Sequence, residues 1–221
     1  MSKTNKSFVI AISGTSGAGK TSLVREVTNS FDDAVSFYFD DYLSTHKVPE
    51  DLAEWSRNGS DPQQWKNPRF LADLRLLRSG TPVTPPNSTD PVYPASIIVV
   101  EEPFGRDREH MGELIDFVAC IELPLEIALA RRVLRTLDEA RQEKTLIRYL
   151  LPFLPTTRAA ARLRSYLRWY LNGPGRDIYY SVTQKAKENC DLVLDGKRPV
   201  SELAQEVVQH VDRVRARSEG P

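Results

Sequence analysis

Short apolar runs alternate with longer amphipathic stretches along this chain of 221 residues. The apolar runs are too short to be buried helices, and they are Phe8–Ile12, Ala34–Phe39, Ile97–Val100, Phe117–Leu123 and Cys190–Leu194. Their nearly continuous hydrophobicity is typical of strands that are covered on both faces. The alternation therefore predicts a mainly parallel sheet with helices on either side.

The amphipathic stretches have apolar residues at helical spacing. They are Ser22–Ser30, Pro68–Ser79, a stretch from Pro124 to about Arg141, Thr145–Leu171 with interruptions at Pro152 and Pro155, and Val200–Val214. Pro124 suits the first turn of a helix, and the segment Gly173–Gly175 should end one. The proline-broken stretch from about 42 to 95 is expected to be an excursion from the sheet that binds substrate.

The composition narrows the class of protein. Lys plus Arg and Asp plus Glu number 30 each, so nucleic-acid binding through bulk charge is not expected. The first apolar run is too short for a signal peptide or a membrane span, so we expect a cytoplasmic protein without membrane contact. Cys120 and Cys190 lack metal-ligand spacing and are expected to be small buried core residues in a reducing compartment. A homo-oligomer is left open.

The segment Gly14–Thr21 fits the P-loop pattern G-x-x-x-x-G-K-[ST], between a predicted strand and a predicted helix. Its backbone amides and the helix N-terminus can hold a polyphosphate. Lys20 should reach the β- and γ-phosphates, and Thr21 should offer its hydroxyl to Mg²⁺. The residues expected to bind ATP are Gly14, Thr15, Ser16, Gly17, Ala18, Gly19, Lys20, Thr21 and Ser22. The motif predicts a single P-loop NTPase domain over residues 1–221, a three-layer α/β/α sandwich with a helical lid.

Carboxylates follow two of the predicted strands, at the edge where ligands bind in such sheets. Asp40 and Asp41 end one strand, and one of them could accept the proton of a substrate hydroxyl. The alternative is an acidic turn or helix cap. Glu101 ends another strand and is expected near the metal. A role for Glu102 is left open.

Positive charge gathers in a predicted lid from about 128 to 176. Between Arg131 and Arg168 the chain has nine arginines and one lysine against three acidic residues. Arginine binds phosphate oxygens through two parallel hydrogen bonds, so a helix with Arg131, Arg132 and Arg135 could cover a triphosphate. The alternative for many of these arginines is a solvated helix face.

Together these residues resemble the uridine kinase and phosphoribulokinase family of P-loop kinases, which includes nicotinamide riboside kinase. The resemblance runs from Phe8 to about Val214, and its motifs are Ile12–Thr21, Asp40–Tyr42, Val99–Glu101, Leu129–Arg135 and Cys190–Gly196. It implies that Asp40 is the catalytic base and that Glu101 lies near the metal. It also implies that Arg132 and Arg135 contact phosphates.

The departures from this family fall on substrate choice. Nucleoside-phosphorylating members have an aromatic residue and an Asp before His-Pro, where this chain has Trp65–Pro68. Lys66 cannot accept hydrogen bonds from ribose but could attract an anionic substrate. Only Tyr93 remains of a tyrosine-rich segment that reads the base. The residues expected to contact the acceptor are Asp40, Asp41, Tyr42, Trp65, Lys66 and Tyr93.

The predicted lid and the segment near the metal also depart from the family's sequence pattern. Glu102 and Pro103 follow Glu101 where the family has Gly, and only Arg141 lies near the family's paired arginines after the lid helix. A role for Arg176 is left open.

The sequence thus predicts an ATP- and Mg²⁺-dependent kinase that phosphorylates a hydroxyl of a small molecule, a nucleoside or another metabolite. Its catalytic residues would be Asp40, Lys20, Arg132 and Arg135, with Thr21 and Glu101 at the metal. The alternative is a nucleotide-gated binding or regulatory protein, in which ATP or GTP would order the lid so that it engages a partner, for example RNA through the arginines. No guanine-reading N-K-x-D occurs in the chain, which lowers the GTPase version of that alternative.

Overall fold

In the part of the chain that the structure describes, the sheet has five strands, and every neighbouring pair is parallel. A computed structural model of the chain describes residues 6–142 and 157–218. The strands lie in the order β2-β3-β1-β4-β5. They are β1 (Phe8–Gly14), β2 (Ala34–Phe37), β3 (Ile97–Glu101), β4 (Phe117–Glu122) and β5 (Leu192–Asp195). The predicted three-layer α/β fold is therefore confirmed.

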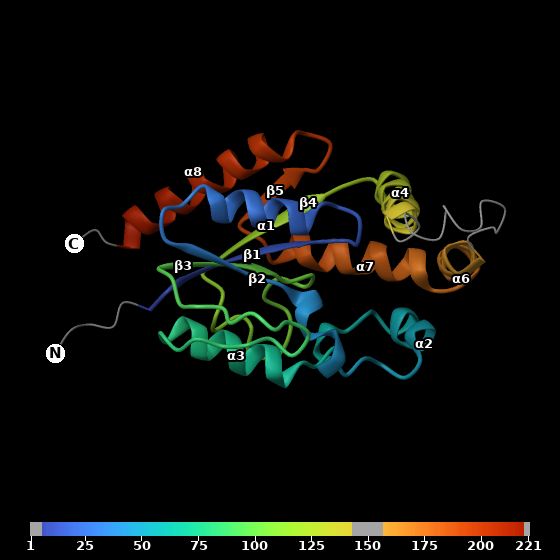
Figure 1. Ribbon diagram of the computed structural model, residues 1–221, viewed down its shortest axis with the longest axis horizontal. Helices are drawn as coiled ribbons and strands as arrows, with labels where there is room; N and C mark the ends of the chain where they lie inside the picture. Colours follow the sequence, from blue (N-terminus) through green and yellow to red (C-terminus); the bar gives the residue numbers. More distant parts are fainter. Residues whose placement is uncertain (1–5, 143–156, 219–221) are drawn as a thin grey trace.

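Helices cover both faces of the sheet (Figure 1). The α-helices are α1 (Lys20–Asn29), α2 (Leu52–Arg57), α3 (Pro68–Arg78), α4 (Leu125–Gln142), α6 (Thr157–Asn172), α7 (Gly175–Glu188) and α8 (Val200–Ser218). Helices α1 and α8 lie together on one face, and α3 lies on the other. Helix α7 packs against β1 and β4. The start of β1 and the end of α8 lie at one end of the molecule, and α4 and α6 lie at the other.

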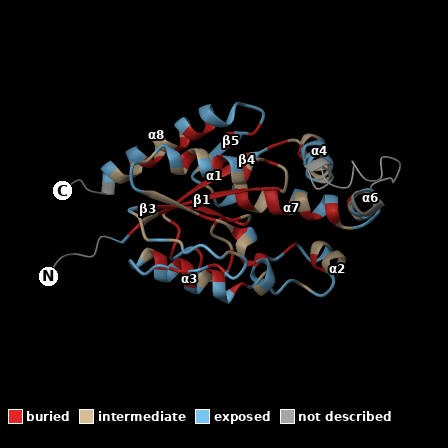
Figure 2. Ribbon diagram, viewed as in Figure 1, coloured by how far each residue is buried: buried red, intermediate tan, exposed pale blue. Residues whose placement is uncertain are grey.

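The three central strands, β1, β3 and β4, are buried along nearly their whole length (Figure 2). In β1, Ile10 and Ile12 pack with α1 and α8, whereas Val9 and Ala11 pack with α3 and the segments beside it. This arrangement accounts for the continuous apolar runs in the sequence. Among the described helices, none is both long and apolar enough to cross a membrane.

The structure corrects several local predictions. The run that begins at Ala34 leaves the sheet at Phe37 and continues as a 3₁₀ helix over Phe39–Thr45. A second short 3₁₀ helix spans Pro62–Gln64 within the excursion. Cys120 is buried as predicted, but Cys190 is only partly buried.

The sequence did not predict α7 at all. Of the predicted helical stretch Thr145–Leu171, the part up to residue 156 lies outside the described residues. The division into one domain, an excursion and a lid stays a prediction.

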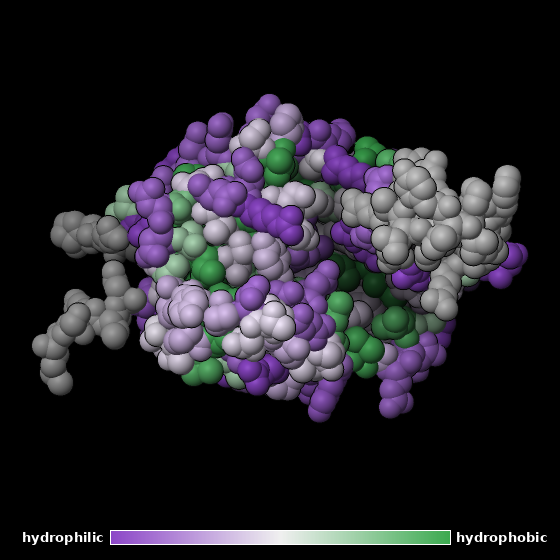
Figure 3. Space-filling view, viewed as in Figure 1, coloured by the Kyte–Doolittle hydropathy of each residue, from purple (hydrophilic) through white to green (hydrophobic). Residues whose placement is uncertain are grey.

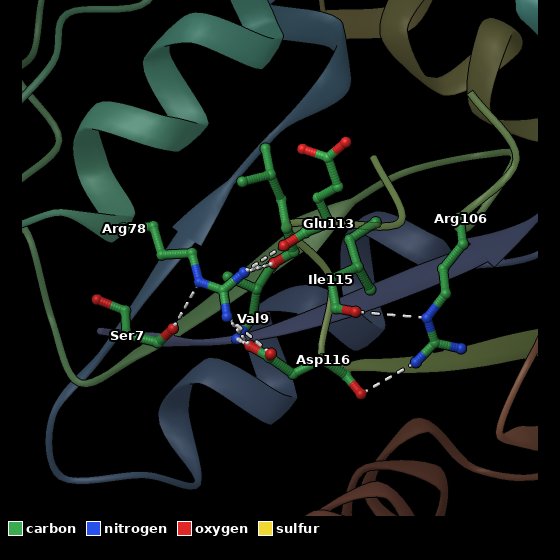
Figure 4. A network of polar contacts seen from close by, with 8 residues as sticks. Ser7, Val9, Arg78, Arg106, Glu113, Ile115 and Asp116 are labelled. Atoms are coloured by element: carbon green, nitrogen blue, oxygen red, sulfur yellow. Dashed lines mark hydrogen bonds and ion pairs between the residues drawn. The ribbon is translucent and has the colours of Figure 1, made fainter. Parts of the chain in front are cut away.

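An arginine network joins segments at the edge of the sheet where β1 and β4 begin (Figure 4). Arg78 donates to both oxygens of Asp116, at 2.7 and 2.9 Å, and Asp116 also accepts from the amide of Val9 at 2.8 Å. Arg106 donates to the carbonyl of Asp116 at 3.0 Å and to the carboxylate of Asp191 at 2.6 Å. We call Arg78, Arg106, Asp116 and Asp191 the amino-end network. Its charges are satisfied by main chain and carboxylates, so it stabilises the sheet.

Candidate active site

A cavity of about 400 Å³ lies at the opposite edge, where the strands end. Its walls come from the P-loop, the turn after β2, the end of β3, and helices α4 and α7. The lining residues are Gly14, Thr15, Ser16, Gly17, Gly19, Lys20, Thr21, Ser22, Phe39, Asp40, Trp65, Glu101, Pro103, Phe104, Arg131, Arg132, Arg135, Ile178, Tyr179 and Val182. In Figure 3 the surface is hollowed between α2 and α4, with hydrophobic residues inside the hollow.

The P-loop backbone has the conformation that only glycine adopts easily. Gly14, Gly17 and Gly19 have φ angles of 131°, 85° and 105°. A Cβ atom on Gly17 would lie 2.3 Å from the carbonyl oxygen of Ala128, so α4 begins in direct contact with the loop. The hydroxyl oxygen of Thr15 is buried and has no hydrogen-bond partner among the described residues. These features fit a loop whose amides and hydroxyls bind a polyphosphate.

Three side chains converge at the start of α1. The hydroxyl of Thr21 donates to Glu101 Oε2 at 2.9 Å. The amine of Lys20 lies 3.5 Å from Glu101 Oε1 and 3.3 Å from the carbonyl oxygen of Thr15. A hydroxyl and a carboxylate oxygen side by side are ligands that Mg²⁺ accepts, together with phosphate oxygens and water. The described residues contain no cluster of three or more His, Cys, Asp or Glu side chains that could hold a metal alone. The site therefore fits a magnesium ion that is bound together with its nucleotide.

The acidic pair after β2 divides between two environments. Asp40 is exposed and lines the cavity, whereas Asp41 does not line it. Burial, with the nearby charges of Asp40 and Glu101, raises the pKa of the Asp41 carboxyl. Tyr42 is fully buried, and its hydroxyl donates to Asp73 Oδ2 at 2.9 Å. The structure thus brings Asp40 to the cavity and directs Tyr42 into the core beneath α3.

The three arginines expected on the lid helix all line the cavity, but they differ in their contacts. Arg131 donates to the carbonyls of Ala18, at 3.4 Å, and Gly196, at 3.0 Å, so it ties α4 to the P-loop. The guanidinium of Arg132 lies over the ring of Tyr166, 5.6 Å from its centroid. Arg135 is 3.8 Å from Glu139 in an exposed pair. The side chain of Arg141 lies outside the described residues.

The residues expected to bind the acceptor do not all line the same cavity. Trp65 lines the main cavity, and the adjoining cavity of about 220 Å³ also touches it. Lys66 lines only this second cavity, where Arg108, Glu109 and His110 also lie. Tyr93 is 64% exposed and lines neither cavity.

Two residues whose roles the sequence left open also lie outside the main cavity. Arg176 is exposed and does not line it, and neither does Glu102.

Sequence reasoning missed the apolar wall of the cavity. Ile178, Tyr179 and Val182 come from α7, and Phe104 follows β3. Trp55 packs with Phe104, Ile178 and Val182 in one cluster, which Trp65 and Tyr179 border. The spacing of Ile178, Val182 and Ala186, four residues apart, was a helical signal that could have revealed α7. The contribution of Phe104 had no such signal.

His46 was also missed. Its ring lies 4.1 Å from that of Phe39, centroid to centroid, and its Nε2 atom is buried without a hydrogen-bond partner among the described residues. Burial and, next, the charge of Arg108 lower the pKa of His46 to about 4, and Asp40 opposes them. The imidazole is therefore neutral near pH 7.

Comparison with known proteins finds relatives that share one name, uridine kinase. The chain is 27% identical over 197 residues to the uridine kinase of Borrelia garinii subsp. bavariensis, covering 84% of this chain and 85% of that one. It is 30% identical over 148 residues to the uridine kinase of Leuconostoc citreum, covering 61% of this chain and 70% of that one. A solved structure of a possible uridine kinase from Bacillus stearothermophilus has a TM-score of 0.52 at 17% identity, with 88% and 91% of the two chains covered. No protein-family model matches the chain.

Proposed function

This chain belongs to the uridine kinase-like family of P-loop kinases, and on that premise we propose that it transfers the γ-phosphate of ATP, with Mg²⁺, to a hydroxyl of a small molecule. One observation carries the proposal beyond family membership. Asp40, Lys20, Glu101 and the lid arginines line the same cavity as the P-loop. Phosphoryl transfer requires a base, groups that bind the phosphates and oxygen ligands for the metal, and it requires little more from the protein.

Each residue has a distinct task in this proposal. Asp40 accepts the proton of the acceptor hydroxyl, because it is the carboxylate of the cavity wall that has no cation within ion-pair distance among the described residues. Lys20 and the amides from Gly14 to Ser22 bind the phosphates. Thr21 and Glu101 provide oxygen ligands at the metal. Bound Mg·ATP would supply the phosphoryl group and the metal's positive charge.

The lid arginines complete the site. Arg132 and Arg135 bring positive charge to the cavity that the P-loop also lines, and this charge would stabilise the negative charge that spreads over the transferred group. Arg131 has another task, because its guanidinium already bonds two carbonyl oxygens. It holds the first turns of α4 against the loop.

The acceptor would lie between Asp40 and the apolar wall. Trp65, Phe104, Ile178 and Tyr179 favour an acceptor with a flat, apolar face, such as a nucleobase or one face of a sugar ring. Lys66 would meet only an acceptor that extends past Trp65 into the second cavity. We propose that an anionic group, if the acceptor has one, binds there.

The test is ADP release with Mg·ATP across nucleosides, nicotinamide riboside, pantothenate, glycerate and pentose phosphates. Lys20→Ala is the blank, since it lacks the amine that binds phosphate. Release that depends on one compound and is absent in the blank supports the kinase. ATP binding without release for any compound would instead favour a nucleotide-gated binding protein. Comparing Lys66→Ala with the wild type on neutral and anionic acceptors tests the charge preference.

A further inference from the structure

A buried ion pair lies directly behind the carboxylates of the site. The Glu102 side chain is 0% exposed and that of Arg108 is 5% exposed. Arg108 donates from Nε to Glu102 Oε1 at 3.0 Å and from Nη2 to Oε2. The amide of Phe104 donates to Oε1 as well, at 3.2 Å. Two parallel charge-assisted bonds fix the plane of the guanidinium relative to the end of β3.

The same guanidinium lies over two aromatic rings. Its Cζ atom is 5.1 Å from the centroid of Phe39 and 5.2 Å from that of Phe70. Phe39 also contacts the ring of His46. Since Phe39 immediately precedes Asp40, the pair connects the strand end that has Glu101 to the turn that has Asp40. These are the two carboxylates that line the cavity.

Stability alone is a poor reason for this pair. Taking two charges out of water costs about as much as their attraction returns, and apolar replacements of buried pairs are often neutral or stabilising. The geometry, in contrast, is specific. The two parallel bonds to Glu102 fix the orientation of the Arg108 guanidinium, and the guanidinium packs against one face of the Phe39 ring.

We propose that Arg108 is a positioning residue for the phosphoryl-transfer reaction, and that Glu102 fixes Arg108. Acting through Phe39, the pair sets the place of Asp40 relative to Glu101. This inference rests on the proposed function, in which Asp40 takes the acceptor's proton. A displacement of about 1 Å in such a constellation can cost about a hundredfold in rate.

The decisive variant is the double replacement Glu102→Leu with Arg108→Met, because it removes both charges and leaves neither one buried alone. We expect its thermal unfolding midpoint to stay near that of the wild type, while kcat falls about tenfold to a hundredfold. The dissociation constant for ATP should change less than about twofold, since the P-loop is untouched. The single variant Arg108→Lys keeps a cation near Phe39 but loses the two parallel bonds to Glu102. Its kcat should therefore lie between that of the wild type and that of the double variant.

The matched control is Arg78→Met in the amino-end network, which removes a similarly bonded arginine from the other edge of the sheet. It should lower the unfolding midpoint and leave kcat unchanged. If the double variant stays folded and keeps kcat within about twofold, the positioning role is wrong while the kinase stands. If the wild type phosphorylates no acceptor, the proposed function fails first, and this inference fails with it.

Discussion

At the edge of the sheet where β1 and β4 begin, Arg78 and Arg106 donate to carbonyl oxygens and carboxylates. At the edge where the strands end, Arg132 lies over a tyrosine ring, and Arg135 makes a single long, exposed ion pair within the described residues. We propose that the two regions use the same side chain for different purposes. Where the protein's own oxygens satisfy a guanidinium, it stabilises the fold. Where they do not, it remains available to phosphate oxygens.

The comparison also shows why the count of arginines in the predicted lid was a weak guide. Arg131 belongs to that count, but it resembles the amino-end arginines because its partners are carbonyl oxygens. Variants that remove a side chain at one edge should therefore change activity, whereas variants at the other edge should change stability.

The largest effect is expected for Asp40→Asn. Loss of a general base lowers kcat by roughly 10²- to 10⁴-fold, and ATP binding should be largely kept. Measurement of kcat with the acceptor found in the panel checks this. Asp116→Asn is the control at the other edge, since it weakens the bonds to Arg78 and Val9 and should affect only unfolding. Near-wild-type turnover by Asp40→Asn would show that another group takes the proton.

A smaller loss of activity is expected for Arg132→Ala and for Arg135→Ala. Each removes positive charge that faces the phosphates, which costs about 10²-fold in kcat if the charge acts in the transition state. Arg75→Ala is the control, because Arg75 does not line the cavity and makes an exposed 3.8 Å pair with Glu113. Equal kcat in all three variants would place both lid arginines with the solvated surface.

The amino-end network should respond in stability alone. Arg78→Met leaves Asp116 without its cation and several carbonyl oxygens without a donor, so we expect a loss of about 2–3 kcal/mol in the free energy of unfolding. Urea unfolding of the variant and the wild type measures it. The comparison between the two edges breaks down if this variant loses turnover while its stability is kept.

The last prediction concerns the dependence of stability on pH. His46 has a pKa of about 4 in the folded protein against 6.5 ordinarily, so the unfolded chain binds the extra proton first as pH falls. The free energy of unfolding should therefore decrease from pH 6.5 to about pH 4. His46→Gln should show a shallower decrease over that window in urea unfolding at several pH values. An identical slope in both proteins would mean that the imidazole takes up its proton without cost in the fold.

The sheet and the phosphate side of the site could be predicted because local patterns determine them. Strands covered on both faces leave continuous apolar runs, as in Phe8–Ile12, and the P-loop has fixed glycine positions. Glu101 and Asp40 could be identified because parallel strands present their carboxyl ends at one edge.

The acceptor side could not be predicted in the same way. Tyr42 follows Asp40 by two residues, yet the 3₁₀ helix turns it into the core toward Asp73. Glu101 and Glu102 are neighbours in sequence, but Glu101 lines the cavity and Glu102 does not, and only the fold reveals Arg108 as the partner of Glu102. Lys66 and Trp65 are likewise adjacent, but only Trp65 reaches the main cavity.

The contact between Gly17 and Ala128 limits how the lid helix can move. The backbone of α4 leaves no room for even one carbon atom on the loop, and Arg131 bonds Ala18 one turn further along. The first turns of α4 are therefore held against the loop, and we expect a closing motion over the nucleotide to involve bending beyond Arg131. Since Arg132 and Arg135 follow immediately, small bends at this point would change their reach to the phosphates while the loop itself stays in place.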